Sequence, residues 1–197
     1  QASSSAASDV YKRQNNAWNL DRTPGGSSGG CASVVAAGIS IISFCNDSGG
    51  SIRIPAHFSG VYGLKTSFGG ISAQGIITQT RKKVATLNMR TLLSSGMLGQ
   101  SVDDLKVALS IIQTSKLNSS DREQRPANSL KLLWVDELPG FEVDHKIKKA
   151  FSELRLLLEK AGVHIVNFAH DQFDFSETIR LWGCLLYTSP SPRDSFR

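Results

Sequence analysis

The stretch that decides the fold is PGGSSGGCASVVAAGISIISFCNDSGGSIRIP, residues 24–55. Two clusters rich in glycine and serine stand near its ends, the first at residues 25–30 and the second at residues 48–51, with an apolar segment between them. The small and apolar residues 31–40 predict a closely packed helix beside the first cluster, and residues 41–45 predict a buried strand. The second cluster predicts a turn that ends at Pro55.

Strand and helix signals continue to alternate beyond this stretch. GVYGLK, residues 60–65, predicts a short strand, and residues 66–92 predict a loop with short strands. A helix is predicted from Ser101 to about Ser115, because Ser101 and Asp104 form a capping pair and the apolar residues that follow share one face.

The later part of the chain predicts a strand, a helix and a second strand. LKLLWVDE, residues 130–137, and VHIVNF, residues 163–168, have the composition of strands. Between them Asp144 is placed to cap a helix, and Gly162 is placed to end it. The order of elements favours the α/β class over all-α or all-β folds.

Composition excludes several classes of protein. Of 197 residues, 40% are hydrophobic and 20% charged, as in ordinary globular proteins rather than disordered or disulfide-rich ones. The formal charge of +5 is spread along the chain, so a nucleic-acid partner is not expected. No apolar run approaches the roughly 20 residues that span a bilayer. We therefore expect a soluble, cytoplasmic protein, and the oligomeric state stays open.

Both ends of the chain differ from the rest. Residues 4–14, SSAASDVYKRQ, and residues 184–194, CLLYTSPSPRD, resemble conceptual translations of sequencing-library adapters. We therefore expect residues 1–14 and 184–197 to be non-native tails, and residues 15–183 to be a fragment of one domain. Within that fragment Cys31 and Cys45 are expected to be buried free thiols, because they lack the spacing of metal ligands.

The two glycine and serine clusters are the candidates for chemistry. Glycine lets the backbone adopt positive φ, and consecutive turn amides can stabilise an oxyanion, while serine supplies a nucleophile. Two flexible turns remain an alternative interpretation, and a phosphate-binding loop is disfavoured because no Gly-Lys-Ser or Gly-Lys-Thr follows. A nucleophile elbow at Ser28 is rejected, because NLDRTP before it is a poor strand ending.

RTPGGSSGG, the alanine-rich segment, DSGGSIRIPA and GVYGLK together resemble the amidase signature enzymes, and the resemblance extends more weakly through SSGMLGQSVDDL to about Gln113. It implies an α/β fold with a mixed sheet flanked by helices, of which this chain would hold a part. It also implies a Ser-Ser-Lys triad that hydrolyses carboxylic amides through an acyl-enzyme. A small-molecule amide is then the expected substrate, and no metal or organic cofactor is required.

The resemblance assigns roles to individual residues. Ser51 matches the nucleophile, and Ser27 matches the bridging serine that a cis peptide holds in the family. Backbone amides of the second cluster match the oxyanion hole, namely those of Ser48, Gly49, Gly50 and Ser51. Three further side chains are expected to support the two loops: Ser28, Asp47 and Arg53.

The lysine of the triad has no match in this chain. In the family it lies well upstream of the first cluster, whereas Lys12 belongs to the adapter-like segment and Lys65 matches a structural lysine. The 197-residue chain is therefore expected to be inactive, although its parent would be an amidase.

Two alternatives stay open. The first is the A subunit of the glutamine-dependent tRNA amidotransferase, which usually has Gln where this chain has Ile54, so that Ile54 favours a general amidase. The second is a non-catalytic, degenerate member of the family. Cys45 stands where glycine is usual, and its side chain could crowd the nucleophile loop.

Overall fold

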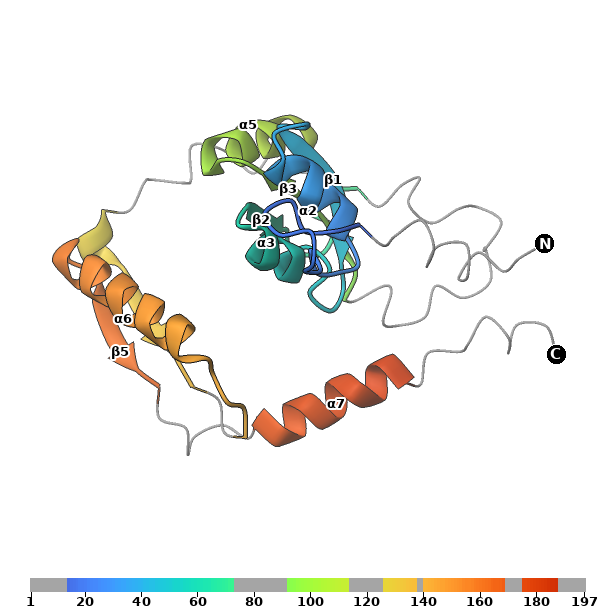
Figure 1. Ribbon diagram of the computed structural model, residues 1–197. Helices are drawn as coiled ribbons and strands as arrows, with labels where there is room; N and C mark the ends of the chain where they lie inside the picture. The colour runs from blue at the N-terminus through green and yellow to red at the C-terminus, as the bar shows by residue number, and fades with distance from the viewer. Residues whose placement is uncertain (1–13, 73–91, 114–125, 138–139, 169–174, 188–197) are drawn as a thin grey trace, which may run out of the picture. The chain divides into compact units, whose positions relative to one another are not determined.

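The computed structural model divides the chain into two compact units, residues 1–116 and 117–197 (Figure 1). The structure describes the following residues: 14–72, 92–113, 126–137, 140–168 and 175–187. Both units combine helices with a small sheet, one antiparallel and one parallel, which confirms the α/β class. Within the described residues, no helix combines the length and the apolar character needed to cross a membrane.

A three-stranded antiparallel sheet lies at the centre of the first unit. Its strands are β1 (Ile42–Asp47), β2 (Tyr62–Lys65) and β3 (Ser94–Gly99), in the order β1-β3-β2. The predicted strands at 41–45 and 60–65 are thus confirmed. The first is less buried than expected, however, because Ile41 and Phe44 are 64% and 61% exposed.

The central strand, β3, was not predicted from the sequence. All of its residues are buried, and its sequence SSGMLG shows neither the alternation of a half-buried strand nor a run of β-branched residues. Gly96 explains part of this composition. A Cβ atom at Gly96 would lie 2.0 Å from the carbonyl oxygen of Leu64 on β2, so only glycine fits where these two strands approach.

Three helices pack with this sheet. They are α2 (Gly29–Ala36), α3 (Arg53–Ser59) and α5 (Val102–Ile112). Helices α2 and α5 were predicted, and Ser101 caps α5 by accepting a hydrogen bond from the Asp104 amide at 3.0 Å. The turn predicted to end at Pro55 instead leads into α3. Pro55 lies in the first turn of α3, where a missing N–H costs little.

The core of the first unit forms two clusters. The first joins α2, β1, α3 and β3, through residues that include Ala32, Val35, Ile52 and Leu98, all without exposed surface. The second joins β3 to α5 through Met97, Leu105 and Ala108. Helix α2 is therefore fixed against the sheet directly after the first glycine and serine cluster.

The second unit contains the predicted strand, helix and strand. Strand β4 (Lys131–Trp134) pairs in parallel with β5 (His164–Asn167), and α6 (His145–Lys160) connects them. Asp144 caps α6, since its side chain accepts from the Lys146 amide at 2.8 Å. Gly162 follows α6 with φ of 84°, as expected of a residue that ends a helix.

A further helix, α7 (Phe175–Tyr187), completes the described part of the second unit. Its start was not predicted from the sequence. The helix continues past Gly183, the last residue of the segment expected to be native.

Candidate active site

The first glycine and serine cluster forms a tight loop that leads into α2. The Gly25 amide donates to the Thr23 hydroxyl oxygen at 3.1 Å, and Gly25 has φ of 80°. The peptide bond between Gly26 and Ser27 is cis, which is the conformation that the resemblance implied for this serine. The Ser27 side chain is exposed, and Ser28 occupies the N-cap position of α2.

The second cluster folds around the carboxylate of Asp47. This side chain has no exposed surface, and it accepts hydrogen bonds from the backbone amides of Gly50 (2.8 Å), Ile52 (3.0 Å) and Arg53 (3.3 Å). The Arg53 guanidinium adds two more, from Nε at 3.0 Å and Nη2 at 2.8 Å. Five donors on one buried carboxylate fix the backbone of the turn that carries Ser51.

These donors also determine the charge state of Asp47. Burial by itself would raise the pKa of the carboxyl. The hydrogen bonds from the Arg53 side chain and from the amides of Gly50, Ile52 and Arg53 outweigh burial and hold the pKa of Asp47 well below its usual range. The carboxyl is therefore ionised in the folded protein at neutral pH.

A direct hydrogen bond connects the two clusters. The Ser28 amide donates to the Ser51 carbonyl oxygen at 3.2 Å, so the residue that follows Ser27 is fixed to Ser51. The structure thereby brings both serines assigned to the triad onto loops that contact each other.

The Ile54 side chain, 43% exposed, lies close to one glycine of each cluster. A Cβ atom at Gly50 would lie 2.6 Å from Ile54 Cδ1, and one at Gly25 would lie 3.2 Å from Ile54 Cγ2. Both glycines have positive φ, which disfavours a side chain there, and at Gly25 a Cβ atom would also crowd the Pro55 backbone. The residue that separates the two amidase alternatives in the sequence is thus part of the packing between the loops.

The amides assigned to the oxyanion hole differ in their surroundings. The Gly50 amide is directed to the Asp47 carboxylate at 2.8 Å. Ser48 and Gly49 precede it in the same turn, and Ser51 follows it directly before α3. Gly50 is buried, whereas Gly49 is exposed and Ser48 and Ser51 are partly exposed. Of these four amides, the Gly50 amide is thus the one with a side-chain acceptor among the bonds within the described residues.

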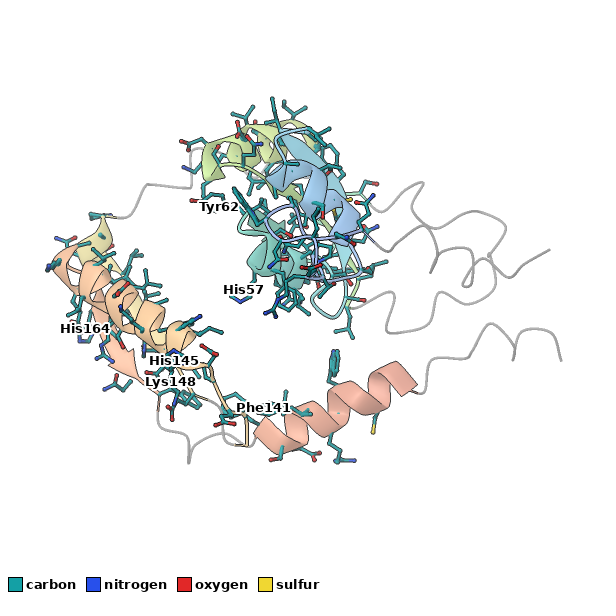
Figure 2. The ribbon with its side chains drawn as sticks, in the orientation of Figure 1. His57, Tyr62, Phe141, His145, Lys148 and His164 are labelled. Carbon is teal, nitrogen blue, oxygen red and sulfur yellow. The ribbon has the colours of Figure 1, made fainter. Side chains whose placement is uncertain are left out.

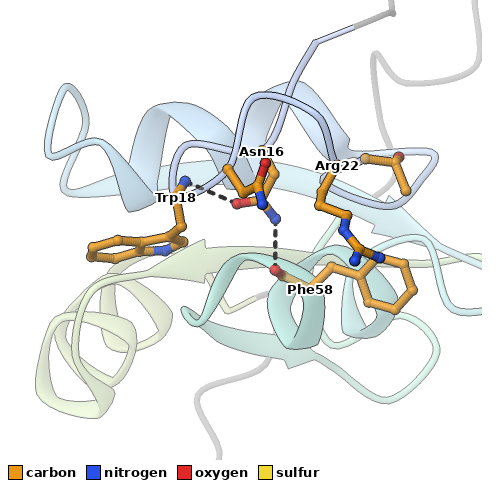
Figure 3. A pocket seen from close by; sticks show the side chains of 6 residues that line it. Asn16, Trp18, Arg22 and Phe58 are labelled. Atoms are coloured by element: carbon orange, nitrogen blue, oxygen red, sulfur yellow. Dashed lines mark hydrogen bonds between the residues drawn. The ribbon is translucent and has the colours of Figure 1, made fainter.

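Residues 16–18, which precede the first loop in the chain, are bonded to the end of α3. Asn16 Nδ2 donates to the Phe58 carbonyl oxygen at 2.7 Å, and Trp18 Nε1 donates to that of Ser59 at 2.8 Å. Asn16 Oδ1 also accepts from the Trp18 amide, as Figure 3 shows. These bonds connect residues 16–18 to the end of α3, the helix that begins after Ser51.

This segment borders a pocket of about 420 Å³ (Figure 3). Its wall includes Trp18, which is 73% exposed. The pocket lies beside the first cluster, since Thr23, the acceptor for the Gly25 amide, is among its lining residues: Asn16, Trp18, Asn19, Arg22, Thr23 and Phe58. Arg22 begins the RTPGGSSGG motif, whereas no motif marked Phe58, which reaches the pocket only through the fold.

The lysines and histidines among the described residues have other surroundings. Lys65 Nζ donates to the Ser94 hydroxyl oxygen at 3.2 Å, across β2 and β3. His57 points outward from α3, whereas His145, Lys148 and His164 belong to the second unit (Figure 2). Lys148 is ion-paired with Glu137 there. Lys12, the one lysine before the first cluster, lies outside the described residues.

Cys45 and Cys31 lie on the core side of the two loops. Cys45 belongs to the cluster of Ala32, Val35 and Ile52, and Cys31 packs against that cluster from α2. Cys45 is 9% exposed, so the side chain that stands where glycine is usual occupies the core.

Comparison with known proteins gives a consistent result. The chain matches the family model described as Amidase over residues 1–190. It is 33% identical over 177 residues to the A subunit of the glutamyl-tRNA(Gln) amidotransferase of Persephonella marina, covering 84% of this chain and 35% of that protein. It is 34% identical over 140 residues to the corresponding protein of Methanosarcina acetivorans, covering 71% and 27%. The chain thus spans about a third of the length of these relatives.

Solved structures resemble this one over most of its length. A fatty acid amide hydrolase superposes with a TM-score of 0.65 at 26% identity, covering 79% of this chain and 28% of that one. A protein described as an amidase superposes with a TM-score of 0.64 at 28% identity, covering 91% and 41%.

Proposed function

This chain belongs to the amidase family, and from that premise we propose that the whole protein hydrolyses a carboxylic amide with Ser51 as the nucleophile. The observation that carries the proposal is the hydrogen bond from the Ser28 amide to the Ser51 carbonyl, which joins the two loops. The Asp47 carboxylate supports it, because it fixes the turn before Ser51 attacks.

The proposed steps are those of a Ser-Ser-Lys triad. The Ser51 hydroxyl attacks the amide carbonyl after its proton passes through Ser27 to a base. Amides of the turn then stabilise the oxyanion, with Ser48, Gly49 and Ser51 as donors and Gly50 held by Asp47. Ser27 returns a proton to the leaving nitrogen, and water hydrolyses the acyl-enzyme. A small amide is the proposed substrate.

The base is proposed to be a neutral lysine from sequence outside these 197 residues. Lys65 is not assigned, because its ammonium group donates to Ser94 at 3.2 Å on the sheet. On this proposal the 197-residue chain alone does not turn over amides, since a serine hydroxyl without a base is a weak nucleophile.

The experiment uses a fluorophosphonate probe and an amidase assay on the full-length protein. Ser51→Ala abolishes labelling and lowers kcat by on the order of 10³-fold or more. Ser27→Ala lowers kcat strongly as well but leaves Ser51 in place. Ser110→Ala is the matched control, because this exposed serine on α5 bonds only to its own helix, at the Val107 carbonyl, and activity stays unchanged. Full activity in Ser51→Ala would reject the proposal.

A second candidate function is the A subunit of a tRNA amidotransferase. It is favoured by the relatives in Persephonella marina and Methanosarcina acetivorans, which carry that description. Ile54 argues for the general amidase. Glutaminase activity that appears only with the partner subunits would support the second candidate, and hydrolysis of simple amides without them would support the first.

A further inference from the structure

The pocket beside the first cluster has aromatic walls that solvent reaches. Trp18 is 73% exposed and Phe58 is 48% exposed, although aromatic rings are mostly buried in folded proteins. Figure 3 shows Asn16 between the Trp18 ring and the Arg22 guanidinium, with the Phe58 ring on the Arg22 side. The volume of about 420 Å³ suits a small organic molecule. Exposed rings that line a hollow of this size are typical of a binding site.

Hydrogen bonds hold these walls in place without a ligand. Trp18 Nε1 donates to the Ser59 carbonyl oxygen at 2.8 Å, which fixes the indole ring at the end of α3. Asn16 is 5% exposed, and its Nδ2 donates to the Phe58 carbonyl oxygen at 2.7 Å. The Asn16 amide donates to the Arg22 carbonyl oxygen at 2.9 Å. Because the wall is held in advance, a ligand that enters it orders few further groups, which favours binding.

The polar groups of the pocket are suited to an anion. Arg22 is its charged residue, and it has no ion-pair partner among the described residues. Thr23 Oγ1 accepts from the Gly25 amide, so its hydroxyl hydrogen is left to donate. Asn19 Oδ1 accepts from the Asp21 amide, so its Nδ2 is left to donate. No acidic side chain is among the described residues that line the pocket.

We propose that this pocket binds an aromatic carboxylate, with the carboxylate on Arg22 and the ring against Trp18 and Phe58. A guanidinium pairs with a carboxylate through two parallel N–H···O bonds, and the donors of Thr23 and Asn19 add to them. An aromatic ring packs edge-to-face or offset against aromatic walls. No lining residue is assigned to the triad or to the oxyanion hole, so the inference does not rest on the proposed function.

An NMR titration of the 197-residue chain with phenylacetate tests the proposal. The indole N–H signals of the three tryptophans are followed in isotope-labelled protein, and Trp18→Phe identifies the Trp18 signal by its absence. We expect phenylacetate to shift this signal and to leave those of Trp134 and Trp182 in place, because both belong to residues 117–197. The concentration dependence of the shift gives Kd, which should be about 1 mM or lower for a ligand of this size.

Three related compounds separate the ring from the charge. Acetate and inorganic phosphate carry negative charge without a ring, and phenethyl alcohol carries the ring without charge. Each should bind at least about ten-fold more weakly than phenylacetate. Phosphate that binds as tightly as phenylacetate would overturn the aromatic part of the proposal. Phenethyl alcohol that binds as tightly would overturn the role of Arg22.

Two variants test the walls of the pocket separately. Arg22→Met removes the charge and should raise Kd about ten-fold or more, whereas Arg22→Lys keeps the charge without the fork and should give an intermediate Kd. Phe58→Leu removes the ring but keeps the carbonyl oxygen that accepts from Asn16, and should raise Kd about three-fold. Arg180→Met is the matched control, because this exposed arginine on α7 is paired with Glu177 in the second unit, and Kd stays unchanged. Unchanged signals of the β1 and β3 amides show that each variant is folded.

Two further outcomes would overturn the inference. If phenylacetate shifts no Trp18 signal up to about 20 mM, the pocket does not take an aromatic carboxylate. If Ser51→Ala removes the shift, the ligand binds at the nucleophile loop rather than in this pocket. An unchanged Kd in Ser51→Ala supports the inference whatever that variant does to amidase activity, so the two proposals fail separately.

Discussion

The two units of this chain are built from similar elements but are held together differently. In the first unit Ala32, Val35 and Leu98 have no exposed surface, and neither has the charged side chain of Asp47. In the second unit α6 has no buried residue within its described length, and Leu154 and Leu157 are 46% and 64% exposed. The first unit thus has a core between several elements, whereas the second joins β4 to β5 and buries Trp134 and Val163 but leaves its helix exposed.

The first unit carries the two candidate catalytic serines, whereas α6 of the second unit connects two strands. The loops with Ser27 and Ser51 are positioned by a carboxylate, a glycine pair and an inter-loop hydrogen bond, each of which joins residues from separate elements. Helix α6 instead has a capping aspartate at its start and Gly162 after its end. The effect of a substitution on local stability should therefore extend through the first unit but stay local in the second.

Removal of the Asp47 carboxylate is the strongest test of this contrast. Asp47→Ala leaves the amides of Gly50 and Ile52 without their acceptor in a buried turn, and we expect a loss of about 3–5 kcal/mol in the stability of the first unit. Hydrogen exchange of β1 and β3 amides should accelerate, while that of β4 and β5 amides is unchanged. Arg53→Ala is the control with a smaller expected loss, because it removes an exposed partner and keeps the backbone donors.

Paired glycine substitutions give the next largest effect. Gly96→Ala places a Cβ 2.0 Å from the Leu64 carbonyl oxygen between two paired strands, and should cost about 3 kcal/mol. Gly183→Ala meets nothing within 4 Å in α7, and should stabilise that helix by about 0.5–1 kcal/mol. Urea denaturation of the two variants measures both changes in the free energy of unfolding. Equal effects of the two would contradict the contrast between the units.

Acid is a weaker form of the Asp47 test. The pKa of Asp47 is lowered in the folded state, so its contribution to stability is present above the unfolded pKa of about 3.9 and is lost as pH falls through the lower, folded value. The urea concentration at the midpoint of unfolding, followed through the β1 and β3 amides, should therefore decrease as the pH is lowered below about 4. In Asp47→Asn this part of the pH dependence disappears. An unchanged acid profile in that variant would mean that Asp47 titrates normally.

The sequence predicted what local rules determine. It placed α2, α5 and α6, both helix caps and the two strands of the second unit, because capping residues, glycine stops and apolar spacing act within one element. It missed β3 because that strand's composition reflects close approach to β2 at Gly96 and burial on all sides. It placed Pro55 in a turn because nothing local shows that Asp47 starts a helix there by binding the Ile52 and Arg53 amides.

For the candidate site the division is similar. The motifs identified the two clusters and the side chains of Asp47 and Arg53 as supports. They did not show that Ile54 lies between Gly25 and Gly50, or that Asn16 and Trp18 bind the end of α3, because each contact joins residues far apart in the chain.

Helix caps give the smallest effect and the sharpest comparison, because both units have one. Ser101→Ala and Asp144→Ala each remove a side chain that accepts from a first-turn amide, and each should cost about 1 kcal/mol locally. Loss of the Ser101 cap should also raise hydrogen exchange in β3, because Leu105 of α5 packs with Met97. Loss of the Asp144 cap should raise exchange only in the first turn of α6. If hydrogen exchange of the β4 and β5 amides also rises in the Asp144→Ala variant, the second unit is as cooperative as the first. Its exposed helix then contributes more to the fold of that unit than the described contacts indicate.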